Sequence, residues 1–269
     1  MPSTVSANNL ERLLSIMARL RDPATGCPWD VKQTFTTIAP YTIEEAYEVA
    51  EAISDGDMTA LEDELGDLLL QVVFHSRMAE EAGHFSFHDV AAAVSDKMVR
   101  RHPHVFAAQP FMDLEEQTVD WESRKAVERQ AKGQTSALDG VASGLPALMR
   151  AHKLQKRAAR VGFDWPAREP VFDKVQEELE EILEVIDQGG QAERLEDEVG
   201  DLLFAAVNLA RHLKVDPETA LRHANHKFER RFKSMESDLA RDGKALDNLD
   251  LESMEKGWQA VKKQEQQQE

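Results

Sequence analysis

Apolar residues recur every three or four positions along almost the whole chain, and this spacing places them on one face of an α-helix. Runs that alternate apolar and polar residues, as a half-buried strand requires, do not stand out. Asp216 and Asp250 are predicted helix N-caps, and Ser86 with Asp89 forms a predicted capping box. The periodicity predicts an all-α fold, with helices over residues 8–22, 42–55, 59–82, 87–102, 114–132, 145–161, 170–188, 192–213, 217–241 and 251–266.

Five sequence elements occur twice, in the same order and 130 to 137 positions apart. They are a Gly-x-x-Trp segment, a Glu-Glu-x-x-Glu segment, a Glu-x-Gly-Asp-Leu-Leu segment, a Lys-x-x-Arg-Arg segment and a single Trp. The first copies begin at Gly26, Glu44, Glu64, Lys97 and Trp121, and the second copies begin at Gly162, Glu177, Glu198, Lys227 and Trp258. An ordered repeat of this kind indicates a duplicated unit. We interpret the chain as a tandem repeat of two helical-bundle domains, residues 1–132 and 145–269, joined by a linker over residues 133–144.

The chain carries 32 Lys and Arg against 50 Asp and Glu, a formal net charge of −18 at pH 7. A surface this acidic repels nucleic-acid phosphates, so we expect no nucleic-acid partner. The one cysteine, Cys27, excludes an internal disulfide framework and is typical of a reducing compartment. No apolar stretch approaches the ~18 residues of a membrane span, and no secretory leader opens the chain. We expect a cytoplasmic protein without a membrane partner.

The second copy of the repeat carries four carboxylates at helical spacing. Glu178 and Glu181 share one helix face, and Glu198 and Asp201 share a face of the next helix. Because Gly189-Gly190 stands between the two helices, they can run antiparallel with their acidic faces opposed. Four such groups repel one another unless a cation lies between them, and all-oxygen ligands suit Mg²⁺, with Mn²⁺ as the alternative. The first copy offers an equivalent set as a second candidate metal site: Glu45, Glu48, Glu64 and Asp67.

A single acidic pair on a helix is more often solvated surface than a metal site. Here the pairs recur with a glycine retained inside the helix, at Gly66 and Gly200, where glycine costs ~1 kcal/mol relative to alanine. A close approach of another helix, or of a ligand to the backbone, would explain these glycines and favours the metal-site interpretation. The apolar remainder of the second helix is expected to hold it against the bundle: Leu195, Val199, Leu202, Leu203 and Ala206.

A basic cluster follows the acidic one. Lys227, Arg230 and Arg231 stand at three- and four-residue spacing on a later helix, and such side chains are the usual protein partners of phosphate oxygens. Acidic and basic clusters together indicate a polyphosphate bridged through metal. The alternative is that the cations pair with Glu229 and Glu236 on the helix surface.

The two halves differ around their acids. The second half has Lys174 for Tyr41, Arg194 for Ala60 and Asn208 for Phe74. Each added cation near a polyphosphate can contribute ~1–3 kcal/mol through charge-assisted hydrogen bonds, so Lys174 and Arg194 are candidate substrate contacts. We expect the carboxyl-terminal half to be the main catalyst and the amino-terminal half to serve packing, dimerisation or weak binding. The alternative is that both sites work.

With these residues in place, the sequence resembles the MazG nucleoside triphosphate pyrophosphohydrolases, among the all-α pyrophosphatases. The resemblance extends over essentially the whole chain and includes the segments CPWD and GFDW, one before each acidic motif. It implies hydrolysis of nucleoside triphosphates, ribo- or deoxyribo-, between the α and β phosphates to a monophosphate and pyrophosphate. It also implies dependence on Mg²⁺ and a homodimer packed through its helices.

The resemblance assigns roles to individual residues. The metal ligands would be Glu178, Glu181, Glu198 and Asp201. The triphosphate contacts would be Lys227, Arg230 and Arg231, and Trp258 would be a nucleotide contact. A spare carboxylate, Glu177, is a candidate general base for the attacking water, and the alternative is an ordinary surface residue.

Two other protein classes compete with this interpretation. A di-iron carboxylate bundle needs Glu-x-x-His on two helices, and the chain has this pattern only at Glu81-Ala-Gly-His84. A non-enzymatic helical scaffold or regulatory nucleotide-binding protein would release no pyrophosphate from any nucleotide. Metal analysis tests the first alternative, because a di-iron protein would contain iron and show a visible absorption band, and product analysis tests the second.

Overall fold

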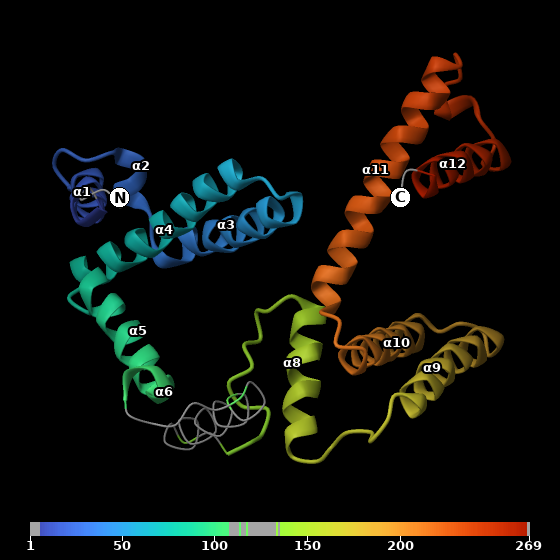
Figure 1. The fold of residues 1–269 in the computed structure, drawn as a ribbon, viewed down its shortest axis with the longest axis horizontal. Coiled ribbons are helices and arrows are strands. Elements are labelled where there is room, and N and C mark those ends of the chain that lie inside the picture. The colour runs from blue at the N-terminus through green and yellow to red at the C-terminus, as the bar shows by residue number, and fades with distance from the viewer. Residues whose placement is uncertain (1–5, 108–112, 114–116, 118–132, 134, 268–269) are drawn as a thin grey trace. The chain divides into compact units, whose positions relative to one another are not determined.

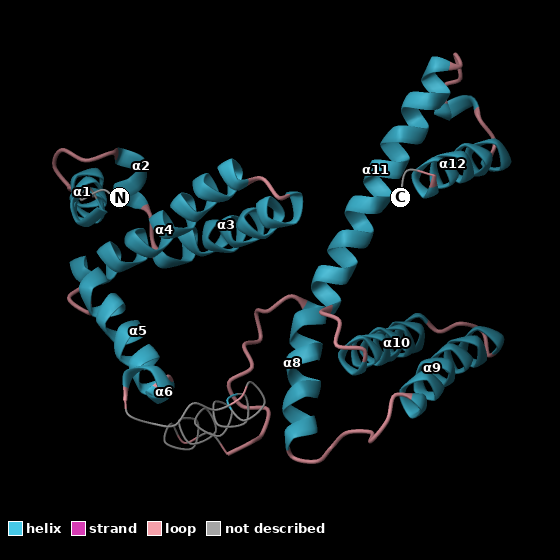
Figure 2. Ribbon diagram, viewed as in Figure 1, coloured by secondary structure: helices cyan, strands magenta, loops and turns pink. Residues whose placement is uncertain are grey.

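The computed structural model describes residues 6–107, 113, 117, 133 and 135–267. The chain divides into two units, Met1–Arg124 and Lys125–Glu269. The described segments are helices joined by loops, without a strand (Figure 2), so the predicted all-α class is confirmed. No helix in these segments is both long enough and apolar enough to cross a membrane. The predicted helix over 114–132 lies outside the described residues apart from residue 117, and the predicted linker over 133–144 stays a prediction.

The first unit is built around an antiparallel helix hairpin. It contains α1 (Ser6–Leu20), α2 (Pro28–Lys32), α3 (Phe35–Asp55), α4 (Met58–Glu81), α5 (Phe87–Arg101) and α6 (Pro103–Phe106). Helices α3 and α4 lie side by side (Figure 1), and α1 and α5 pack against α4. The hairpin turns at Gly56, whose φ of 71° suits glycine, and Asp57 then caps α4. The core of this unit consists of Met17, Ile38, Val73, Phe74 and Met78.

Helix α3 begins seven residues earlier than the predicted start at residue 42. Thr34 and Thr37 form a capping box that fixes this start, and Ile38 in the first turn is buried. The helix therefore contains Pro40, at which a sequence pattern normally ends a helix. The short helices α2 and α6 were also not predicted, since each is too short to show a period.

The second unit repeats the hairpin and adds a second helix pair. Its elements are α8 (Ala147–Arg160), α9 (Glu169–Asp187), α10 (Ala192–His212), α11 (Pro217–Arg241), η1 (Leu246–Asn248) and α12 (Leu251–Gln266). Helices α9 and α10 lie side by side, and α8 packs against α10 (Figure 1). Helices α11 and α12 pack together around Met235, Leu239 and Val261. The predicted caps Asp216 and Asp250 are confirmed, as is the Ser86–Asp89 capping box.

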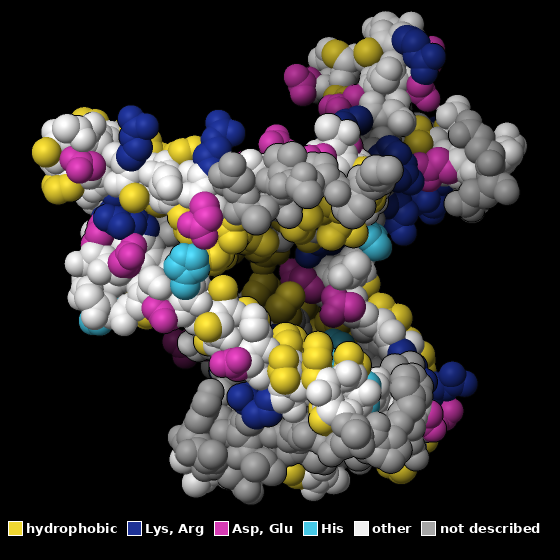
Figure 3. Space-filling model, turned by 60° about the vertical axis from the view of Figure 1, so that its left-hand side comes forward, with side chains coloured by type: hydrophobic (Ala, Val, Ile, Leu, Met, Phe, Trp, Pro, Cys, Tyr) yellow, Lys and Arg dark blue, Asp and Glu magenta, His cyan; other side chains and the backbone are white. Residues whose placement is uncertain are grey.

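The hairpin helices leave apolar side chains uncovered. Of the five residues predicted to hold α10 against the bundle, Val199, Leu203 and Ala206 are exposed, so the prediction was wrong for these three, while Leu195 and Leu202 are half-buried. Hydrophobic side chains, drawn in yellow, also reach the surface on the face shown in Figure 3. A Cβ added at Gly66 or Gly200 would meet no described atom within 4 Å. The described chain therefore makes no close approach at these glycines, and approach by a ligand or a second chain stays a prediction.

Candidate active site

Three carboxylates meet in the α9–α10 hairpin of the second unit. Glu178 comes from α9, while Glu198 and Asp201 come from one face of α10, and an oxygen of each lies within 4.8 Å of the others. Glu178 is only 3% exposed, and its Oε2 has no hydrogen-bond partner. A buried carboxylate oxygen without a partner is costly. The cluster is therefore suited to receive a cation.

Lys174 places a positive charge beside this cluster. It precedes Glu178 by one helical turn, and its Nζ donates hydrogen bonds to Glu178 Oε1 at 2.7 Å and Glu177 Oε1 at 3.0 Å. These hydrogen bonds raise the pKa of Lys174, so the ammonium group stays charged at neutral pH. Lys174 thus offsets part of the negative charge on α9 and remains close to whatever binds there.

Glu181, the fourth predicted ligand, lies close enough to interact with the same cluster. Partial burial raises the pKa of Glu181, and the proximity of Glu178 raises it further. The four predicted ligands are thus crowded, which is the condition that a divalent cation relieves.

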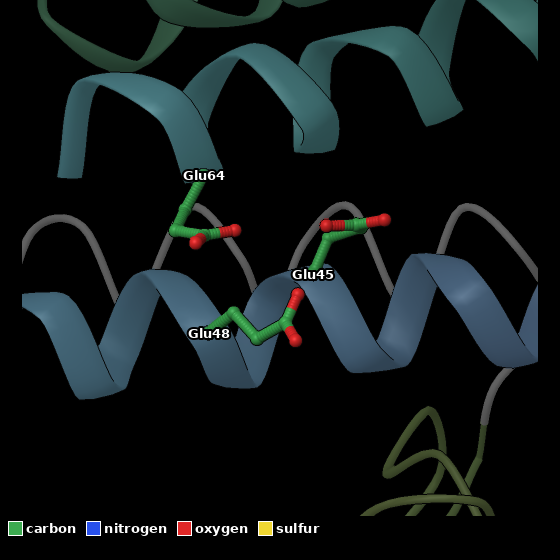
Figure 4. A group of neighbouring side chains, drawn as sticks. All are labelled: Glu45, Glu48 and Glu64. Carbon is green, nitrogen blue, oxygen red and sulfur yellow. The ribbon is translucent and has the colours of Figure 1, made fainter. Parts of the chain in front are cut away.

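The first unit holds an equivalent cluster at the same place in its hairpin. Glu45 and Glu48 on α3 and Glu64 on α4 point toward one another (Figure 4), with ligand oxygens within 4.8 Å. Partial burial and then the charges of Asp67 and Glu48 raise the pKa of Glu45, so the fourth predicted acid also lies nearby. Gln71 Nε2 donates to Glu45 Oε1 at 3.3 Å. Both hairpins therefore gather carboxylates, although the three within 4.8 Å differ: Glu48 belongs to the first cluster, and Asp201 belongs to the second.

A pocket of about 770 Å³ adjoins the cluster of the second unit. Helices α8, α9 and α10 and the loop between α8 and α9 form its walls, and Lys174, Glu178 and Asp201 are among its lining residues. Its volume lies in the range of small-molecule and cofactor sites. Most of the wall is apolar, with the exposed aromatic side chains Phe163 and Trp165 from the loop and Phe204 from α10.

A chain of hydrogen bonds ties the GFDW loop to α10. Asp164 accepts from two nitrogens of Arg211, at 2.9 Å for Nη1 to Oδ2, and its Oδ1 also contacts His212 Nε2 at 3.1 Å. Arg211 in turn donates from Nε and Nη2 to Asn208 Oδ1, at 3.0 and 2.8 Å. The hydrogen bonds from Arg211 hold the pKa of Asp164 below its usual range. This network fixes both the loop and the Asn208 amide at the pocket.

Other predicted site residues lie outside the pocket wall. Glu177 is exposed and bonds to Lys174, while Arg194 donates to Gln188 Oε1 at 2.8 Å. Arg230 and Arg231 on α11 pair with Glu265 on α12, at 3.1 and 2.7 Å, and Trp258 on α12 packs against Phe228 at 5.2 Å between ring centroids. Lys227, on the same helix as these arginines, is exposed. Glu265 is thus the observed partner of the two arginines, in place of Glu229 or Glu236, and the predicted contacts of α11 and α12 with a nucleotide stay predictions.

The sequence pattern did not reveal three residues of the pocket. Gln155, Asp164 and Arg211 line it, yet none was singled out. Asp164 was noted only as part of the GFDW repeat element. Gln155 in the amphipathic helix α8 was the available signal. Its polar side chain is buried, and a buried polar side chain usually has a hydrogen-bonding role.

The fold and the clusters define an all-α protein that gathers carboxylates between paired helices, an arrangement used by helical carboxylate metalloproteins. Residues 33–106 and 169–235 match the MazG nucleotide pyrophosphohydrolase domain. The chain belongs to this family, and the two matched segments contain the two hairpins.

Among the relatives matched over nearly their whole length are the following two. The chain is 55% identical to the "Nucleoside triphosphate pyrophosphohydrolase" of Escherichia coli (strain K12), over 96% of this chain and 98% of that protein. It is 45% identical to the "Nucleoside triphosphate pyrophosphohydrolase/pyrophosphatase MazG" of Thermotoga maritima, over 94% of this chain and 95% of that protein. The resemblance seen in the motifs is therefore confirmed.

Proposed function

We propose that this protein is a hydrolase of acid anhydrides that splits a nucleoside triphosphate into a monophosphate and pyrophosphate. The observation that carries the proposal is the buried Glu178, clustered with Glu198 and Asp201 and with one oxygen unpartnered, in the wall of a pocket large enough for a nucleotide. Membership of the MazG family and the names of the two relatives support the same activity.

The donor set fits a divalent metal with a preference for oxygen ligands. Oxygens bound to Mg²⁺ at ~2.1 Å lie about 3–4 Å apart, so small side-chain movements would bring the clustered oxygens into range. Glu178, Glu198, Asp201 and Glu181 would hold Mg²⁺, with Mn²⁺ as the alternative. When bound, the metal supplies charge that offsets the triphosphate and acidifies water.

Other residues of the second unit would contact the phosphates or accept a proton from the attacking water. Lys174, beside the cluster, would contact a phosphate oxygen by a charge-assisted hydrogen bond. Glu177 is exposed and hydrogen-bonded to Lys174, so it can take a proton from the attacking water on the solvent side of α9. Lys227, Arg230 and Arg231 would approach the distal phosphates, which requires Arg230 and Arg231 to exchange Glu265 for phosphate.

The carboxyl-terminal half is the proposed main catalyst. Its cluster opens on the pocket that Lys174 and Asn208 line. At the equivalent positions the first half has Tyr41, which is exposed, and Phe74, which is buried in the core. The cluster of Glu45, Glu48, Glu64 and Asp67 would serve as a metal site with an auxiliary role.

A homodimer accounts for the uncovered faces of the hairpins. The exposed apolar residues of α9 and α10 include Leu179, Leu183, Ile186, Val199 and Leu203. Exposed apolar residues that gather on two neighbouring helices, in contrast to ones scattered singly, are typical of an interface. A second copy of the chain would bury it and would also explain the vacant space at Gly200. We place the dimer in the cytoplasm, in keeping with the single Cys27.

Product analysis tests the proposed activity. The purified chain is incubated with ATP, GTP, CTP, UTP and their deoxy forms, with Mg²⁺ and with chelator, and the products are separated. We expect monophosphate and pyrophosphate in equal amounts, and only with the metal. Diphosphate with orthophosphate would place cleavage at the β–γ bond and reject the assignment, and release of neither would favour a regulatory nucleotide-binding protein.

A further inference from the structure

Two buried amides stand at the pocket wall, and the fold uses only one polar group of each. Gln155 on α8 is 7% exposed and Asn208 on α10 is 8% exposed, and both line the pocket. Gln155 Nε2 donates to the backbone oxygen of Phe204 at 2.8 Å. Since a carbonyl only accepts, this bond fixes the orientation of the amide and leaves Oε1 as the free group. Gln155 Oε1 is buried without a hydrogen-bond partner.

Asn208 presents the opposite group. Its Oδ1 accepts two hydrogen bonds from Arg211, which has no acceptor of its own. The amide orientation is therefore fixed, and Nδ2 is left as a donor without an acceptor among the described residues. Arg211 is itself held by Asp164, so this donor is positioned before any ligand arrives.

Gln155, on α8, is hydrogen-bonded to the same turn of α10 that carries Asn208. The carbonyl of Phe204 that receives Gln155 stands four residues before Asn208, which is the hydrogen-bonding distance of an α-helix. The pocket thus offers one acceptor and one donor at the same turn of α10, and the exposed aromatic rings of Phe163, Trp165 and Phe204 line the same pocket. An adjacent donor and acceptor on the edge of a flat aromatic ring is what every nucleobase carries, and base–aromatic stacking contributes ~1–3 kcal/mol per base.

The distance from the acidic cluster suits the same ligand. Asp201 and Asn208 are seven residues apart on α10, about 10 Å at 1.5 Å per residue. This is comparable with the length of a nucleoside. A triphosphate at Glu178 and Asp201 would therefore carry its base to the level of the two amides.

Resting on the proposed function, we propose that Gln155 and Asn208 read the base of the nucleotide: Gln155 Oε1 accepts a base N–H, and Asn208 Nδ2 donates to the neighbouring carbonyl or ring nitrogen. The two amides are then specificity-determining residues. A base edge that lacks the N–H leaves Gln155 Oε1 buried and unpaired, which is the situation that gives a polar site its strongest discrimination.

The test compares nucleotides that differ only at the base edge. The best natural substrate is found first, and its kcat/KM for pyrophosphate release is compared with that of its methylated partner: 3-methyl-UTP, N4,N4-dimethyl-CTP, 1-methyl-GTP or N6,N6-dimethyl-ATP. In the unaltered protein we expect methylation to lower kcat/KM by about 10- to 100-fold. In Gln155→Met the kcat/KM of the natural substrate should fall while that of the methylated substrate stays unchanged. The ratio of the two kcat/KM values then approaches one. The matched control is Gln176→Met, since Gln176 lies exposed on α9 and bonds only to Glu180; it should keep the ratio.

Asn208→Asp gives a directional second test, because it replaces the donor by an acceptor of the same shape. We expect the preference to shift from UTP toward CTP and from GTP toward ATP, because CTP and ATP carry an amino group at the ring position where UTP and GTP carry a carbonyl oxygen. The charge added by Asp acts equally on both members of each pair, so the shift in preference is a readout that a structural role would not move.

Three results would overturn the inference. The first is an unchanged kcat/KM ratio between natural and methylated substrate in Gln155→Met, with the same Tm as the unaltered protein. This result would show that Gln155 does not face the base. A change confined to the ratio between ribo- and deoxyribonucleotides would assign the amides to the sugar. A chain that hydrolyses no nucleotide would remove the proposed function itself, an outcome distinct from active enzyme with unaltered base preference.

Discussion

The substitution Glu178→Gln isolates the charge at the centre of the cluster, because it keeps the shape of the side chain. In the metal-free protein, the substitution weakens the charge-assisted hydrogen bond from Lys174 at 2.7 Å, at a cost of about 1 kcal/mol. It also removes a carboxylate that is 3% exposed and has an unpartnered oxygen, and it lessens repulsion with Glu181 and Glu198. These effects oppose each other, so we expect the metal-free stability to change by less than about 1 kcal/mol.

The metal-bound protein should behave differently. A Mg²⁺ concentration of 100 times Kd stabilises the unaltered protein by about 2.7 kcal/mol. Loss of a direct ligand should weaken binding about 100-fold or more, given that outer-shell changes already cost 10- to 100-fold. At the same concentration the variant then gains only about 0.4 kcal/mol. The difference of about 2.3 kcal/mol corresponds to roughly 5–9 °C in Tm for a unit of this size.

The assay is thermal unfolding across a MgCl₂ titration, with pyrophosphate release measured on the same samples. We expect turnover to fall by at least about 100-fold, since the metal and the substrate charge are both affected. Glu180→Gln is the matched control, because Glu180 is exposed on the same helix and accepts only from Gln176. If Glu178→Gln keeps the turnover and the Mg²⁺-dependent shift of the unaltered protein, the cluster does not form the metal site.

The remaining predictions concern the repeat, the interface and the loop. Glu45→Gln, the equivalent change in the first half, should leave most of the turnover, and loss of activity there with Glu178→Gln tolerated would place catalysis in the other half. Leu203→Glu should convert a dimer to a monomer in sedimentation, because a side chain that is 54% exposed in the single chain would be buried in the interface; a monomer before substitution contradicts the dimer. Asp164→Asn should lower the stability at neutral pH by about 1–3 kcal/mol. Because the folded pKa of Asp164 is lowered, this contribution exists above the ordinary pKa near 3.8 and is lost as pH falls through the folded value, so the melting curves of the two proteins should converge in acid.

The sequence was most informative where local periodicity and function coincide. The acidic pairs stand at helical spacing on helices with caps or glycine turns at their ends, so both hairpins and the meeting of Glu178 with Glu198 and Asp201 could be predicted. The repeat allowed each half to check the other. At each of these carboxylates, the residue type and its spacing along the helix indicated the same site.

Contacts between distant segments could not be predicted in the same way. Asp164 and Arg211 are 47 residues apart, and Gln155 and Phe204 are 49 apart, so neither pair leaves a periodic signal. Glu265 was not expected as the partner of Arg231 for the same reason. The start of α3 was missed because the Thr34–Thr37 capping box outweighed the proline that follows it.

Phe74 makes the two halves of the repeat unequal, because the core of the first unit depends on its ring. It stands where the second half has Asn208, but it is 4% exposed, packs with Met17, Ile38, Val73 and Met78, and lies 5.3 Å beneath the Arg21 guanidinium. Removing such a ring costs about 3–5 kcal/mol, a large part of the net stability of a domain. The substitution Phe74→Asn would therefore destabilise the first unit, whatever contact the new amide could make with a base. The two halves are therefore unequal in a way that a single substitution at Phe74 would not remove.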